Sequence, residues 1–123
     1  MDLTQDELND IVDRTVAQKI AELKLASVVA DHTETLESTE RLLSIYPSIR
    51  ELESERAKDA TELIEFALFA LRADPYIKII PLIYFYRYSR EEVAKRFGVS
   101  PATVTRNKNR LLKTIKSILF YEV

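Results

Sequence analysis

The segment 88–112 constrains the fold more than any other part of the chain, because it carries start and stop signals for two helices in the right order. Ser89 begins a Ser-x-x-Glu capping box, which is typical of a helix N-terminus. Gly98, the only glycine in the chain, stands where that helix should end, since glycine adopts the left-handed conformation without strain. Ser100 and Pro101 then suit the cap and first turn of a second helix. We therefore predict two helices joined by a tight turn.

Apolar residues recur at helical spacing on both sides of this turn. Small Ala94 suits a close helix crossing, and Val99 is placed to fill the gap between the helices. Lys108 is the one polar member of the second stripe, and its stem can reach outward. The pattern predicts a helix-turn-helix within 89–119. Its expected buried positions are Val93, Ala94 and Phe97 in the first helix and Val104, Leu111, Leu112, Ile115, Ile118 and Leu119 in the second.

The charge of the chain is divided unevenly, although its formal net charge is only −2. Residues 1–65 contain 16 acidic and 7 basic side chains, whereas residues 66–123 contain 4 acidic and 11 basic ones. No acidic residue occurs between Val93 and Tyr121. A stretch with basic and no acidic residues favours nucleic-acid binding, because a helix face that is only solvated usually carries both positive and negative side chains.

The outer face of the second predicted helix is the candidate site, since the corresponding face enters the major groove in helix-turn-helix proteins. Arg106 is the best candidate for a base contact, because its fork can pair bidentately with guanine. Thr103, Thr105 and Asn109 are expected to add shorter contacts. Cationic side chains are expected to hold phosphates, which gives affinity without sequence specificity. The predicted DNA-binding residues are Lys95, Arg96, Ser100, Pro101, Ala102, Thr103, Thr105, Arg106, Asn109, Arg110 and Lys113.

The composition favours an all-α protein and excludes several kinds of site. One glycine and four prolines in 123 residues argue against a turn-rich β fold. The absence of cysteine excludes disulfides and thiolate metal sites, and the single histidine, His32, lies in a polar stretch where we expect it to be solvated. No signal-peptide or membrane-span pattern is present, so we expect a cytoplasmic protein. We predict no catalytic residue, metal or cofactor.

The N-terminal part, residues 1–38, is predicted to be an amphipathic arm and hinge that precedes a DNA-binding domain at 39–123. A helix is expected from about Gln5 to Leu25, and it would need a partner for its apolar stripe. We consider three solutions, which are packing on the C-terminal domain, a homodimer through this helix and packing on another protein, and we favour the homodimer. The stripe consists of Leu8, Ile11, Val12, Val16, Ile20 and Leu23.

Between the arm and residue 88 the pattern predicts further helices. We expect a short one over 39–46, capped by Thr33, Thr35 or Ser38 and broken or kinked at Pro47. A long helix is expected over 48–73, with its second half, which includes Phe66 and Phe69, buried on several sides. The apolar run 76–86 is interpreted as a helix that starts at or just after Asp74 and is kinked or divided in two at Pro81, with its aromatic residues and Tyr88 mostly in the core.

Three separated motifs resemble those of a known family. They are Thr-Glu-Arg-Leu-Leu-Ser-Ile-Tyr-Pro-Ser-Ile-Arg from Thr39, Asp-Pro-Tyr-Ile-Lys-Ile-Ile-Pro-Leu-Ile-Tyr-Phe from Asp74, and Val-Thr-Arg-Asn-Lys-Asn-Arg-Leu-Leu from Val104. The chain from Thr39 to Phe120 resembles the ArpU family of phage and prophage transcriptional regulators and the related RinA-type late activators. Residues 89–112 are also similar to region four of bacterial sigma factors. The resemblance implies a helix-turn-helix regulator that activates late phage genes in a bacterial host cell.

Two other functions remain open from the sequence. A small terminase subunit, which packages phage DNA, would share the DNA-binding face but form a ring of subunits. A sigma-like module that mainly binds RNA polymerase would use the acidic half and need no DNA contact. An enzyme is the weakest alternative, because no phosphate-binding loop or carboxylate pair stands out.

Overall fold

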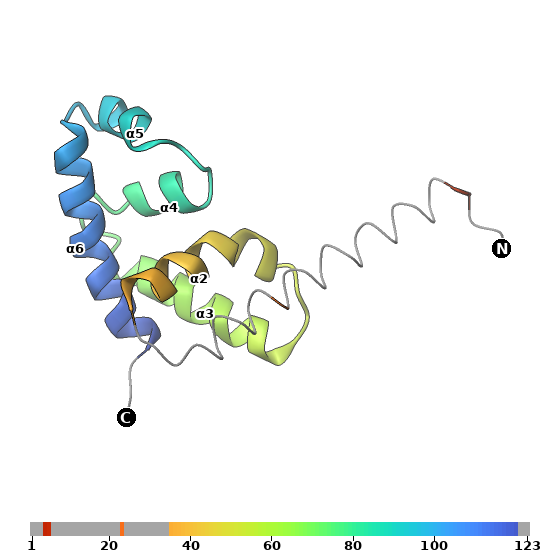
Figure 1. Ribbon diagram of the computed structural model, residues 1–123. Helices are drawn as coiled ribbons and strands as arrows, with labels where there is room; N and C mark the ends of the chain where they lie inside the picture. Colours follow the sequence, from red (N-terminus) through yellow and green to blue (C-terminus); the bar gives the residue numbers. More distant parts are fainter. Residues whose placement is uncertain (1–3, 6–22, 24–34, 121–123) are drawn as a thin grey trace.

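The computed structural model describes Thr4, Gln5, Leu23 and residues 35–120, and all regular structure within these residues is helical (Figure 1). The predicted arm helix, apart from Gln5 and Leu23, and His32 therefore lie outside the described residues. The all-α prediction is confirmed for the described part. Its five helices are α2 (Leu36–Ile49), α3 (Glu55–Ala70), α4 (Ile79–Tyr84), α5 (Arg90–Phe97) and α6 (Pro101–Leu119).

Helix α6 runs along one side of the molecule and contacts each of the other four helices (Figure 1). Its N-terminal half packs with α4 and α5 around a small apolar cluster that contains Val104 and Val93. Its C-terminal half packs with α2, α3 and α4 around a larger cluster that contains Leu111, Leu112 and Ile115. One buried stripe of α6 therefore carries both clusters.

Helix α4 is short but belongs to both clusters. Ile79 packs with α5 and the start of α6, whereas Ile80 and Tyr84 pack with α2 and the end of α6. Our prediction for this segment was wrong in two respects. The helix begins at Ile79, after a series of turns that follows Asp74. Pro81 therefore falls in the first turn, where a helix makes no use of the backbone N–H, so it need not kink the helix.

The caps predicted for α5 and α6 are confirmed. The backbone N–H of Glu92 donates to the Ser89 hydroxyl at 3.1 Å, and that hydroxyl is 3.0 Å from the Glu92 carboxylate. Gly98 ends α5 with φ 65° and ψ 36°, which places it in the left-handed region. Ser100 accepts from the backbone N–H of Thr103 at 3.2 Å at the start of α6.

The division between α2 and α3 differs from the prediction. Thr35, one of three predicted candidates, caps α2, which continues past Pro47 to Ile49. Helix α3 begins only at Glu55, because the hydroxyl of Ser54 accepts from the backbone N–H of Ala57 at 3.2 Å and fixes a new helix start. The connection still contributes to the core, since Leu52 within it is buried.

Two burial predictions were wrong. Phe66 and Phe69 of α3 are about 60% exposed, because the side of α3 that packs on the core carries Ala57, Ile64 and Ala67. In the aromatic run, Tyr84 is buried and Phe85 stacks on Tyr46 at 4.7 Å between ring centroids, as expected for core residues. Tyr86, however, is 68% exposed.

Two tyrosines tie α2 to its neighbours through carboxylates. The Tyr84 hydroxyl of α4 donates to the Glu40 carboxylate of α2 at 2.7 Å. The Tyr46 hydroxyl of α2 donates to the Glu65 carboxylate of α3 at 2.8 Å. Burial and the adjacent carboxylates raise the pKa of Tyr46 to about 12 and raise that of Tyr84 further. Both phenols therefore remain protonated donors at neutral pH.

The Tyr84–Glu40 link should contribute measurably to stability. Tyr84→Phe removes the buried donor and leaves the half-buried carboxylate without this partner, so we expect the free energy of unfolding to fall by about 1–2 kcal/mol. Urea denaturation at pH 7 measures the change. Tyr86→Phe is the matched control, because its hydroxyl belongs to an exposed side chain, and equal losses in the two variants would contradict the assignment.

Candidate nucleic-acid interface

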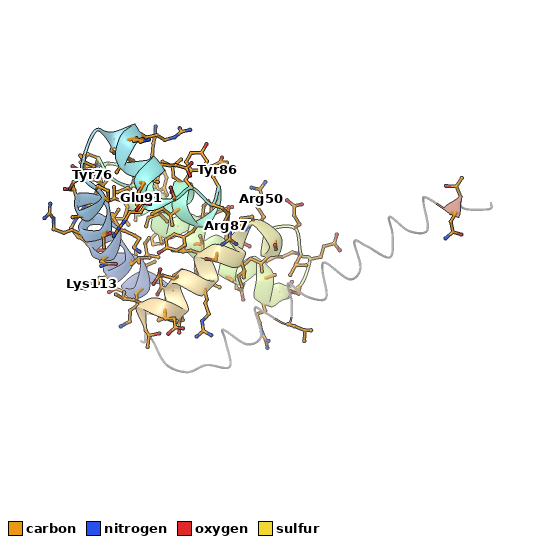
Figure 2. The ribbon with its side chains drawn as sticks, turned by 45° about the horizontal axis from the view of Figure 1, so that its top comes forward. Arg50, Tyr76, Tyr86, Arg87, Glu91 and Lys113 are labelled. Atoms are coloured by element: carbon orange, nitrogen blue, oxygen red, sulfur yellow. The ribbon has the colours of Figure 1, made fainter. Side chains whose placement is uncertain are left out.

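The side of α6 that faces away from both clusters is exposed over most of its length. Its residues follow one another at intervals of four and three positions, which places them on a single helix face. Ala102, Arg106, Asn109 and Lys113 are exposed, and Lys116 at the end of the row is half-buried. Figure 2 shows Lys113 at the outer edge of the molecule, well away from Tyr86 and Arg87. We call this row the α6 outer face.

Its cations are not neutralised by neighbouring carboxylates. Among the described residues, no acidic side chain lies within 4 Å of the charged groups of Arg106 or Lys113. The same holds for Lys95 in the last turn of α5. The hydrogen bond that Arg106 makes is a long one of 3.4 Å to the Thr103 hydroxyl. Among the described residues, these side chains are therefore exposed cations without a carboxylate partner.

Short polar side chains line the first turns of α6 beside the cations. The hydroxyls of Ser100 and Thr103 are 2.9 Å apart, and Thr105 donates to the Pro101 carbonyl at 3.2 Å. Arg90, the first residue of α5, reaches across to donate to the Thr105 hydroxyl at 3.2 Å. The sequence interpretation missed Arg90, because only the crossing of α5 over α6 brings the two residues together.

Arg96 of α5 is oriented by an aromatic ring. Its guanidinium lies 4.6 Å above the centroid of the Tyr88 ring, and the same group donates to the Tyr88 hydroxyl at 2.9 Å. A cation over a ring face is attracted by the electrons of the ring. Arg96 is exposed and keeps a defined direction, whereas Lys95 beside it makes no such contact.

Arg110 differs from the other predicted contacts because its donors are already engaged. Two of its nitrogens donate to the two oxygens of Asp74, at 2.7 and 3.1 Å, and further bonds reach the Asn107 amide oxygen. The hydrogen bonds from Arg110 are the main cause of the lowered pKa of Asp74. The backbone N–H of Tyr76 also donates to the Asp74 carboxylate and lowers its pKa further. This pair fastens the segment between α3 and α4 to the middle of α6.

The structure thus places the eleven predicted residues on two adjoining helices, but not all on one face. Ala102, Arg106, Asn109 and Lys113 form the α6 outer face, with Ser100, Pro101, Thr103 and Thr105 around its beginning and Lys95 and Arg96 at the end of α5. Arg110 lies to one side of the face, bound to Asp74.

Comparison of the chain with protein-family models, with curated proteins and with solved structures gives no match. The likeness to phage regulators therefore rests on the three sequence motifs alone. Within the described ranges, no helix has both the length and the apolar character needed to cross a membrane. Nor do those residues include a group of three or more His, Asp or Glu side chains placed to hold a metal ion.

The Asp74–Arg110 pair should stabilise the fold in a pH-dependent manner. Asp74→Asn keeps an acceptor for Tyr76 but removes the charge, so we expect a loss of about 1 kcal/mol in unfolding free energy at pH 7. Because the folded pKa of Asp74 is lowered, the stability that the pair provides is complete above the usual value of 3.8 and is lost as the pH falls through the folded pKa.

Urea denaturation between pH 7 and pH 2.5 measures this dependence, and the difference between the two proteins should shrink at the acidic end. Glu91→Gln serves as the control, because its pair with Arg90 is long, at 3.5 Å, and both side chains are more than half exposed. A loss from Asp74→Asn that stayed constant with pH would exclude the ion pair as its cause.

Proposed function

We propose that this protein is a transcriptional regulator that binds double-stranded DNA, with α5 and α6 acting as a helix-turn-helix. Helix α6 would be the recognition helix, with its N-terminal half in the major groove. The observation that carries the proposal is the α6 outer face, on which exposed Arg106 and Lys113 have no carboxylate partner among the described residues. Such unpaired, one-signed cations fit the phosphates and base edges of a duplex.

The surroundings of α6 support a recognition role, because they hold this helix rigidly and leave its outer face clear. The buried stripe of α6 is fixed by both apolar clusters, so its opposite side has one defined orientation. Caps at Ser89 and Ser100 and the left-handed Gly98 fix the turn between the helices. A rigid support is what precise contacts to bases require.

Within the proposed interface the residues take different roles. Arg106 reads a base, and Lys113 and Lys95 hold phosphates. Arg96 holds a phosphate in the direction that Tyr88 imposes on it. We assign Arg110 the positioning of α6 through Asp74 instead of a direct phosphate contact.

The family resemblance extends this proposal to a biological setting. A chain similar to ArpU-type regulators and to sigma region four would act at promoters of late phage genes in a bacterial cell, with RNA polymerase as a second partner. Selection of bound sequences from random duplexes would identify the operator. A gel shift with that operator then tests the proposal directly, and the absence of any duplex binding would overturn it.

Arg106→Ala should weaken operator binding by about 1–3 kcal/mol and relax the preference at one base pair, because a bidentate base contact is lost. Fluorescence anisotropy with the operator and with its single-base variants measures both effects. Lys58→Ala is the control, since Lys58 is also an exposed cation but lies on α3, outside the proposed interface. Unchanged affinity and specificity in Arg106→Ala would remove this residue from the interface.

Lys113→Ala should behave differently from Arg106→Ala, because a phosphate contact is independent of sequence. We expect weaker binding to all duplexes alike, and a slope of log K against log salt that is smaller by about one. Anisotropy titrations across a series of salt concentrations measure this slope. A sequence-dependent loss, or an unchanged slope, would contradict the phosphate role.

The mass in solution separates the regulator from the packaging alternative. A regulator of this size is expected as a monomer or a dimer, because operators commonly mirror a two-fold axis. A small terminase would form a larger ring. Light scattering on the full chain distinguishes the two, and a ring would favour the packaging function.

A further inference from the structure

The second half of α3 exposes large apolar side chains to solvent. Of the large apolar side chains that the structure describes as exposed, three lie in the second half of this helix: Leu63 at 42%, Phe66 at 60% and Phe69 at 61%. Burying a single side chain of this size is worth about 1.5–3 kcal/mol. Contiguous exposed apolar patches often mark contact surfaces.

Part of this surface forms an open groove between α3 and α6. Its volume is about 480 Å³, and it is lined by Leu63, Phe66, Thr114, Ser117, Ile118 and Leu119. The lining is mostly apolar, with two hydroxyls from α6 at one side. It lies on the C-terminal half of α6, whereas the recognition half proposed above is the N-terminal one.

We infer that this groove is the docking site for the apolar stripe of the chain's own N-terminal segment, residues 8–23. The stripe has helical spacing, and its last member, Leu23, is 61% exposed in the structure, so its apolar surface is uncovered there. Leu23 and the groove are therefore two exposed apolar surfaces within one chain. Their union would remove both from water.

The connection between the two surfaces is short enough to favour an intrachain contact. Eleven residues separate Leu23 from Thr35, and such a length can span up to about 40 Å when extended. Helix α2, which begins at Leu36, packs on the same cluster as Ile118 and Leu119 of the groove. A tether of this length that starts beside the groove gives an effective concentration on the order of millimolar, well above that of a free partner.

The charges of the two surfaces also favour the N-terminal segment as the occupant of the groove. Residues 1–23 carry six acidic and two basic side chains. On α6, Lys116 directly precedes the groove residue Ser117, and the described part of this helix contains no acid. An acidic amphipathic helix laid in the groove would thus meet no like charge from α6.

Cysteine pairs test the contact in the full chain, which has no cysteine of its own. Thr114→Cys places a thiol at the groove without removing an apolar group. It is combined in turn with Val12→Cys, Val16→Cys or Ile20→Cys on the stripe, and with Ala17→Cys or Ala21→Cys on the opposite helix face as controls. The measured quantity is the equilibrium for intrachain disulfide formation in a glutathione buffer, read by mass spectrometry.

At least one stripe position should form the intrachain disulfide about tenfold more favourably than either control, as expected for a docked segment. Adding Phe66→Gln should reduce this preference by about fivefold, because it removes apolar surface from the groove. Phe69→Gln, equally exposed but outside the groove lining, should leave it unchanged.

Three results would overturn the inference. One is equal disulfide formation at stripe and control positions. Another is a preference that Phe66→Gln does not reduce. The third is a predominance of disulfide-linked dimers, which would show that the segment docks on a second copy.

Discussion

The burial of one stripe along α6 is the constraint on which the rest of the structure depends. Val104, Leu111, Leu112 and Ile115 are fully buried, and each contributes about 1.5–3 kcal/mol relative to an exposed position. Because a helix is rigid, fixing this stripe also fixes the direction of the opposite one. The same apolar contacts that stabilise the fold therefore decide which polar side chains point outward.

Hydrogen bonds and an ion pair between side chains also hold the helices together. The Tyr84–Glu40 and Tyr46–Glu65 hydrogen bonds join α2 to α4 and to α3, and the Asp74–Arg110 pair fastens a connection to α6. Each link joins residues that are distant in sequence, so each limits the relative movement of two elements. In a domain with a modest core, such directional bonds help to select a single arrangement of the helices.

Much of the C-terminal half could be predicted from the sequence, because its features are local. Ser89, Gly98 and Ser100 act on backbone groups within a few residues of themselves, so the two caps and the turn follow from the sequence alone. The exposure of Ala102 and Arg106 followed from helical periodicity.

The errors concern features that depend on tertiary contacts. Phe66 and Phe69 are apolar, but another side of α3, which carries Ile64, packs on the core, and no periodicity argument decides which of two apolar faces packs inward. Arg110 looked like another free cation because its partner, Asp74, is 36 residues away in the sequence. Arg90 was overlooked for the same reason. The family likeness and the DNA-binding function are of another kind, since the fold neither requires nor excludes them.

Helix α4 has a mechanical consequence for the whole domain. Ile79 and Ile80 are joined by one peptide bond, yet they are anchored in different apolar clusters. A six-residue helix has no room to bend between them, so a rotation of α5 and the start of α6 would be transmitted directly to the packing of α2 and α3. The two apolar clusters should therefore shift together, so that a force that displaces one of them also changes the packing of the other.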